Sequence, residues 1–162
     1  MTDRTAVDQD LLPGARNAVR VCLNIQPDER VTLITDDACA DIAGALVHEI
    51  EAVGAPCECF VLERVAPRPL AGLPAVVAAA MERSQVSIFA ARAQANELGS
   101  RMELTDIVNR RRMRHGHMVN ITAQIMREGM RADYRRVDRL SQQLCDRMPA
   151  ARRLTVRTAA GK

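Results

Sequence analysis

The sequence has almost no aromatic residues: tryptophan is absent, and Phe, Tyr and Trp together make up 2% of the 162 residues. The core must therefore be built from alanine, valine, leucine, isoleucine and methionine. Hydrophobic residues make up 48% of the chain, which argues against intrinsic disorder. The length suits one domain with a substantial core.

Long apolar runs are also missing. No stretch approaches the roughly 18 apolar residues that a membrane-spanning helix needs. The first ten residues, MTDRTAVDQD, are acidic and contain no apolar signal segment. The five cysteines are odd in number and lack the spacing of a disulfide framework. We therefore expect a reduced, cytoplasmic protein that does not contact a membrane.

Lysine is nearly absent: Lys162 is the single lysine among 23 basic residues. Residues 1–100 carry 8 basic and 14 acidic side chains, whereas residues 101–162 carry 15 basic and 6 acidic ones. A basic half can meet nucleic acid or an acidic partner. Binding to bases usually also uses aromatic rings, which are scarce in this chain. The charge pattern favours solvated helix faces, and we do not expect nucleic-acid binding.

The common phosphate-binding and serine-nucleophile motifs are missing too. The eight glycines form neither GxGxxG nor a P-loop, and there is no GxSxG. The apolar run VTLIT is followed by Asp36 and Asp37, whose charges repel phosphate. We therefore expect neither a classical dinucleotide site nor a nucleophilic serine.

Short apolar runs alternate with helical patterns along the chain. Apolar residues at helical spacing predict helices over 12–24 and from Cys39 to Gly54, among others. The runs between the helices predict strands at residues 31–35, 57–62, 86–91, 117–121 and 153–158. This alternation is typical of a parallel sheet covered by helices on both faces. We predict a single three-layer α/β domain over residues 1–162, with a mainly parallel sheet of about five strands.

The stretch RRRMRHGHMVNIT, residues 110–122, has three possible interpretations: a nucleic-acid patch, a metal site, or a junction between two elements. Ser100 and Glu103 have the spacing of a capping box, which would open a helix before this stretch. The arginines then fall in the last helical turns, where cations stabilise the negative end of the helix dipole. With Gly116 as the terminator, we expect a helix end, a turn and a strand.

His115 and His117 would share one face of that strand because they are two residues apart. A zinc site needs a third and a fourth ligand, and His48 is the only other histidine. We therefore expect a structural histidine pair and no bound cofactor. Cys57 and Cys59 have the same spacing, and we expect them to be small core residues.

Several longer stretches resemble the N-terminal domain of the metallo-aminopeptidase family typified by aminopeptidases T and S, often labelled leucyl aminopeptidase-like. They are LLPGARNAVRVCLNIQPDERVTLITDDA, APRPL, RSQVSIFAA, NRRRMRHGHMVNITAQIMREGMRADY and RRLTVRTAAG. The resemblance covers nearly the whole chain, and the stretch from Asn109 to Tyr134 is its most specific part.

The resemblance implies a two-domain hydrolase that removes N-terminal amino acids from peptides with two divalent metal ions of the zinc or cobalt type. The family's ligands lie in the C-terminal domain, which this sequence does not contain, so no catalytic or metal-binding residue maps onto it. The N-terminal domain would shape the substrate cleft and a homodimer interface. The alternatives are a stand-alone, non-catalytic binding module and a domain of the related iron-dependent ring-cleaving dioxygenases.

Polar residues follow two of the expected strands. In open parallel sheets, ligands bind beyond the carboxyl ends of the strands. The residues at these ends are Thr35, Asp36, Asp37, Asn120 and Thr122. We expect them to form either a binding rim beside the cleft or a set of helix caps, because Asp and Thr are preferred capping residues.

Overall fold

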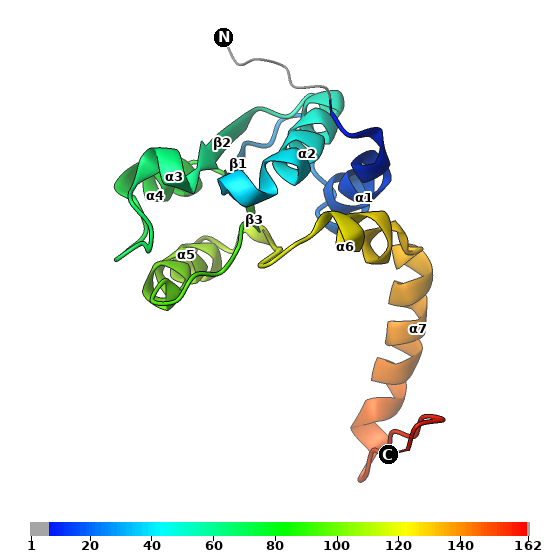
Figure 1. The fold of residues 1–162 in the computed structure, drawn as a ribbon. Coiled ribbons are helices and arrows are strands. Elements are labelled where there is room, and N and C mark those ends of the chain that lie inside the picture. Colours follow the sequence, from blue (N-terminus) through cyan, green and yellow to red (C-terminus); the bar gives the residue numbers. More distant parts are fainter. Residues whose placement is uncertain (1–6, 162) are drawn as a thin grey trace. The chain divides into compact units, whose positions relative to one another are not determined.

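The computed structural model describes residues 7–161. The chain divides into two units at the boundary between Arg131 and Ala132. The first unit is an α/β fold with one open, four-stranded, all-parallel sheet (Figure 1). Its strands, in the spatial order β2-β1-β3-β4, are β1 (Val31–Thr35), β2 (Cys57–Val61), β3 (Val86–Ala90) and β4 (Arg114–His117). The predicted fold class is confirmed.

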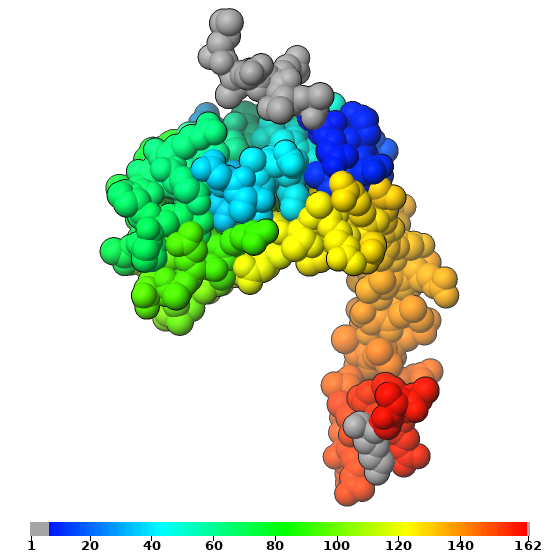
Figure 2. Space-filling view, viewed as in Figure 1, coloured from blue at the N-terminus to red at the C-terminus, as the bar shows by residue number. Residues whose placement is uncertain are grey.

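Helices cover both faces of this sheet. The helices of this unit are α1 (Leu12–Arg16), continued by η2 (Asn17–Cys22), α2 (Ala40–Val53), α3 (Leu62–Val65), α4 (Ala75–Glu82), α5 (Leu98–Arg111) and α6 (Ala123–Arg127). Short 3-10 turns are η1 (Gln9–Leu11), η3 (Asp37–Cys39) and η4 (Gly129–Arg131). In Figure 2 the blue atoms of the first helical segment lie against the yellow atoms of α6, and the two helices are in contact.

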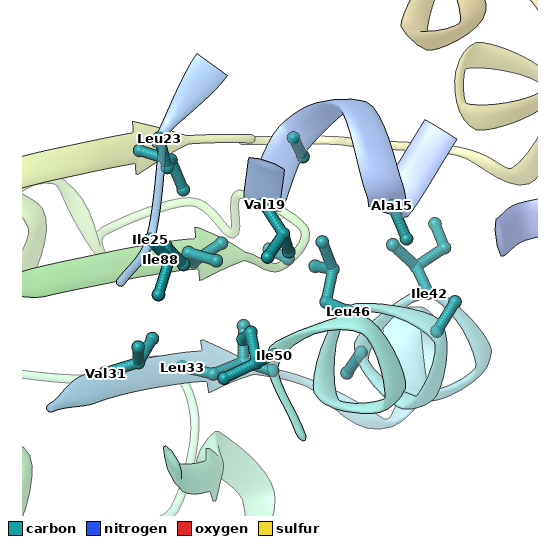
Figure 3. Close-up of a cluster of buried hydrophobic side chains, with 14 of the residues drawn as sticks. Ala15, Val19, Leu23, Ile25, Val31, Leu33, Ile42, Leu46, Ile50 and Ile88 are labelled. Atoms are coloured by element: carbon teal, nitrogen blue, oxygen red, sulfur yellow. The ribbon is translucent and has the colours of Figure 1, made fainter. Parts of the chain in front are cut away.

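The alternation of side chains along the strands divides the core into two clusters. Leu33 and Ile88 point to one face, where they pack with residues of α1, η2, α2 and α6 (Figure 3). Ile34 and Phe89 point to the other face and pack with residues of α3, α4 and α5. Both central strands are buried along their whole length, which is the reason that they read as continuous apolar runs.

The prediction of a fifth strand at residues 153–158 is wrong. Residues 153–157 form no strand in the part of the chain that the structure describes, and Thr158 makes only an isolated bridge to Gly161. Alternating apolar residues favour an extended backbone, but a strand also needs a hydrogen-bonded neighbour. The second unit instead contains α7 (Tyr134–Arg147), whose first turn is capped by the Asp133 carboxylate, and η5 (Met148–Ala150).

The fourth strand lies three residues earlier than predicted. Helix α5 ends at Arg111 because Arg112 adopts a left-handed conformation with φ 51° and donates its N–H to the Asn109 carbonyl at 3.2 Å. Gly116 therefore does not end the helix. It lies within β4, where an added Cβ would stand 3.4 Å from Leu23 Cδ1.

The predicted capping box is also absent. Helix α5 begins at Leu98, so Ser100 lies inside its first turn and its hydroxyl donates to the Glu97 carbonyl. Glu103 instead accepts the Leu73 N–H at 2.7 Å. Among the helices of residues 7–161, none is long and apolar enough to cross a membrane.

Candidate functional site

The topology of the sheet creates a switch point between β1 and β3. From β1 the chain passes through α2 on one face to β2, and from β3 it passes through α5 on the opposite face to β4. The two connections leave in opposite directions, and in open α/β sheets such a point is where ligands bind. The ends of both strands are tied together, because the Thr35 hydroxyl donates to the Ala90 carbonyl at 2.9 Å.

Asp36 follows β1 directly and is 1% exposed. Its Oδ1 accepts the Cys39 N–H at 3.0 Å and so caps the turn η3 that precedes α2. Its Oδ2 accepts the Arg92 N–H at 2.7 Å and an Arg68 Nη1–H at 3.0 Å. Asp36 is therefore the helix cap that the sequence predicts, and it also joins the loops that follow β1 and β3.

Arg68 lies at the centre of this edge and is the residue that the sequence interpretation missed. Its side chain is 4% exposed, and Nε and Nη2 donate to the two carboxylate oxygens of Glu97 at 2.8 and 2.6 Å. Nη1 donates to Asp36 and to Glu63 Oε1, both at 3.0 Å, and Nη2 also donates to the Arg92 carbonyl at 2.8 Å. All five donor positions of the guanidinium are thus used.

No local signal pointed to Arg68, because it lies in the proline-rich segment APRPL and its partners are distant in sequence. Its hydrogen bonds to Glu97 lower the pKa of that carboxyl, and the same contacts raise the pKa of Arg68. Glu97 also accepts the Leu70 N–H at 3.0 Å. A single buried arginine therefore holds the segments that follow β1, β2 and β3.

Three carboxylates surround this one guanidinium, so the edge carries an excess of negative charge. Asp36 and Glu97 are buried, whereas Glu63 is 33% exposed. Asp37 is exposed, and its backbone N–H donates to Glu63 Oε2 at 3.1 Å. The exposed part of this edge therefore offers the carboxylates of Asp37 and Glu63 to a cationic group, beside the exposed cation Arg92, whose charge acts on Cys39.

The structure places the two other predicted rim residues differently. Asn120 adopts a left-handed conformation with φ 58°, and its Oδ1 accepts the Ala93 N–H at 2.9 Å. It therefore lies against the loop that follows β3. Thr122 caps α6, since its hydroxyl oxygen accepts the Ile125 N–H at 3.2 Å. Hydrogen bonds thus connect Thr35, Asp36 and Asn120 to residues 90–93, whereas the bond of Thr122 is within its own helix.

A second cluster of polar side chains lies on β3 and β4. The Ser87 hydroxyl and His115 Nδ1 are 2.8 Å apart, and His115 Nε2 lies 3.0 Å from His117 Nδ1. Burial lowers the pKa of His115 to about 4 and also lowers the pKa of His117. The two imidazoles share one face of the strand, as their spacing predicts. No group of three or more His, Cys, Asp or Glu side chains suited to a metal ion occurs among residues 7–161.

Cys57 and Cys59 lie on β2, which is an edge strand of the sheet. Cys57 is half-buried and Cys59 is exposed, so the prediction that both are buried core residues is wrong. A short apolar run does not distinguish an edge strand from a central one.

We predict that His115 makes the fold sensitive to acid. The unfolded chain binds a proton near the ordinary histidine pKa of about 6.5, but the folded chain resists it until about pH 4. The stabilisation that the neutral His115 gives the fold is complete above pH 6.5 and declines as the pH falls toward 4.

Urea unfolding at pH 7.5 and at pH 5 measures this decline. The free energy of unfolding should fall less between the two pH values in His115→Asn, which keeps an amide near Ser87, than in the unmodified chain. His48→Asn, at an exposed histidine, should follow the unmodified chain; equal losses in all three proteins would contradict the prediction.

Comparisons with known proteins find little. No protein-family model matches the chain, and no curated protein matches it significantly. Among solved structures it is similar to wild-type AmpT from Thermus thermophilus, with a TM-score of 0.39 and 20% sequence identity. That similarity covers 64% of this chain and 30% of the AmpT chain. At this level the likeness does not carry a functional argument.

Proposed function

We propose that this chain is the N-terminal domain of a metal-dependent aminopeptidase, an enzyme that releases N-terminal amino acids from peptides. The proposal is supported by the sequence stretches that resemble this family and by an α/β fold with its carboxyl edge at a topological switch point. In the proposed enzyme this domain forms one wall of the cleft and part of a homodimer interface in the cytoplasm.

The observation that carries the proposal is the acidic carboxyl edge. Arg68 immobilises Asp36 and Glu97, while Asp37 stays exposed beside Glu63. The free end of a peptide substrate is a protonated amine, and an exposed carboxylate on a fixed loop can attract and orient it. Asp37 is therefore the residue through which this domain would act on substrate binding.

Within residues 7–161, no set of side chains fits a two-metal centre. His115 and His117 are only two ligands, and no larger group forms within the described range 7–161. The proposal therefore assigns the two divalent metal ions, of the zinc or cobalt type, to ligands outside this chain. The contribution of this domain is to position the substrate.

The test uses the whole protein encoded by the gene to which this sequence belongs (the native gene product), purified without added tags and supplied with Zn²⁺ or Co²⁺. We expect hydrolysis of aminoacyl anilides and of short peptides with a free amino terminus. Asp37→Asn should raise KM by roughly two- to fivefold, the effect of one exposed charge pair, with kcat and stability little changed. Asp41→Asn, an exposed carboxylate on α2, is the matched control and should leave KM unchanged.

Two outcomes separate the parts of the proposal. A native gene product without aminopeptidase activity under any of these metal conditions would contradict the proposed function. An active enzyme in which Asp37→Asn and Asp41→Asn have the same KM would show that the acidic edge does not bind the substrate amine. Asp36→Asn is a poorer probe, because Asp36 is buried and its loss would disturb the fold.

A further inference from the structure

The geometry of His115 and His117 provides more than a structural pair. The two nitrogens that face each other, Nε2 of His115 and Nδ1 of His117, are 3.0 Å apart. Their ring centroids are 5.3 Å apart and the rings are tilted by 54°, so the two imidazoles converge instead of stacking. His117 is exposed to solvent, and β4 is an edge strand of the sheet. A ligand can therefore approach from the side of His117, where it would also meet the positive charge of Arg101.

We propose that His115 and His117 chelate one divalent transition-metal cation of the copper(II) type, with solvent or an exogenous ligand in the remaining positions. Metal–imidazole bonds are about 2.0–2.1 Å long, so two such bonds at a right angle hold their nitrogens about 2.9 Å apart, and at a tetrahedral angle about 3.3 Å apart. In the structure this 3.0 Å contact is a hydrogen bond between the two rings, so the cation would take the place of the proton that they share. The separation already lies close to the right-angle value, which is typical of tetragonal copper(II) and nickel(II) sites.

Ser87 supplies the outer contact that such a site needs. Its hydroxyl is buried and lies 2.8 Å from His115 Nδ1. In the tautomer whose Nδ1–H donates to Ser87, the lone pair of His115 Nε2 faces His117. Hydrogen bonding of the second ring nitrogen orients a metal-binding histidine and raises its basicity. Ser87 therefore holds one ligand in a fixed orientation, while the more exposed His117 can adjust.

The chemistry of the donors limits the metal to a few ions. Imidazole nitrogen suits zinc, copper and nickel, and for a given nitrogen site copper(II) binds the most tightly of the divalent ions from manganese to zinc. This inference departs from the expectation of no metal ligands, because residue spacing alone does not reveal the distance between the ring nitrogens. It is independent of the proposed peptidase function, whose metal ions are assigned to other residues.

The experiment is a titration of the tag-free chain with Cu²⁺, followed by electron paramagnetic resonance. The exposed thiols of Cys22, Cys59 and Cys145 are first alkylated, because thiolates bind and reduce copper. We expect one equivalent bound, with hyperfine coupling to two nitrogens. His117→Ala should weaken binding at least tenfold, and Ser87→Ala, which keeps both ligands, roughly tenfold.

His48→Ala is the matched control, because it removes the only other histidine, an exposed one on α2. Its affinity should equal that of the unmodified chain. Binding that is unchanged in His117→Ala, binding that is lost in His48→Ala, or a spectrum without coupling to two nitrogens would each overturn the proposal. Circular dichroism of every variant confirms that loss of binding is not loss of fold.

Discussion

Replacement of Arg68 by alanine is expected to lower the free energy of unfolding by about 3–5 kcal/mol, the usual cost of removing one partner from a buried ion pair. The substitution leaves the carboxylates of Asp36 and Glu97 buried, with side-chain exposures of 2% and 3%, and without their guanidinium partner. Urea unfolding at pH 7 measures the loss. Arg68→Lys keeps the charge but has only three donors for five acceptor contacts, so its loss should be intermediate.

Arg83→Ala is the matched control for this prediction. Arg83 pairs with Glu58 at 3.2 Å, but both side chains are about half exposed, so its loss should cost at most about 1 kcal/mol. If Arg68→Ala and Arg83→Ala cost the same, the Arg68 network does not stabilise the edge.

The pH dependence gives a second measure of the Arg68 network. Arg68 lowers the pKa of Glu97 in the folded chain, so this stabilisation is present above the unfolded pKa and is lost as the pH falls. In Arg68→Ala the buried Glu97 carboxylate loses its partner and is stabilised by protonation. The difference in stability between the two proteins should therefore narrow from pH 7 toward pH 4. A constant difference would contradict the electrostatic origin of the effect.

Replacement of Gly14 by alanine is expected to destabilise the fold by about 1–3 kcal/mol, the usual cost of forcing a methyl group into a packed interior. A Cβ at Gly14 would lie 2.4 Å from the Met126 carbonyl oxygen and 3.1 Å from Met130 Cβ. The first contact is with backbone, so α1 and α6 would have to move apart. Thermal and urea unfolding measure the change.

Gly44→Ala on α2 is the matched control for Gly14→Ala. A Cβ at Gly44 meets nothing within 4 Å, so the substitution should stabilise the chain by about 0.5–1 kcal/mol through helix propensity. If Gly14→Ala also stabilised the chain, helix propensity, and not the close approach of α1 to α6, would decide the result.

Local patterns predicted the central elements well. The runs VTLIT and VSIFA became β1 and β3 because central strands of a parallel sheet are buried on both faces. The hydrophobic pattern did not predict the start of β4, because that boundary depends on the backbone conformation of one residue. Arg112, and not Gly116, takes the left-handed conformation that ends α5, and this choice moved β4 to Arg114–His117.

The candidate sites were predictable only in part. Asp36 was expected as a cap because an acidic residue at the start of a helix is a local signal. Arg68 could not be found in this way, because Glu97 is 29 residues and Asp36 is 32 residues away in sequence. The spacing of His115 and His117 predicted a shared face but not which nitrogens converge.

The sequence by itself determined the α/β class, the alternation of helices with short buried strands and the acidic residues after the first strand. These features depend on local hydrophobic period and capping chemistry, which act over a few residues. Only the tertiary structure decided the strand order, the number of strands and the placement of Arg68 among three carboxylates. These depend on which distant segments meet, because a strand or a buried charge is stable only when its partner is supplied by another part of the chain.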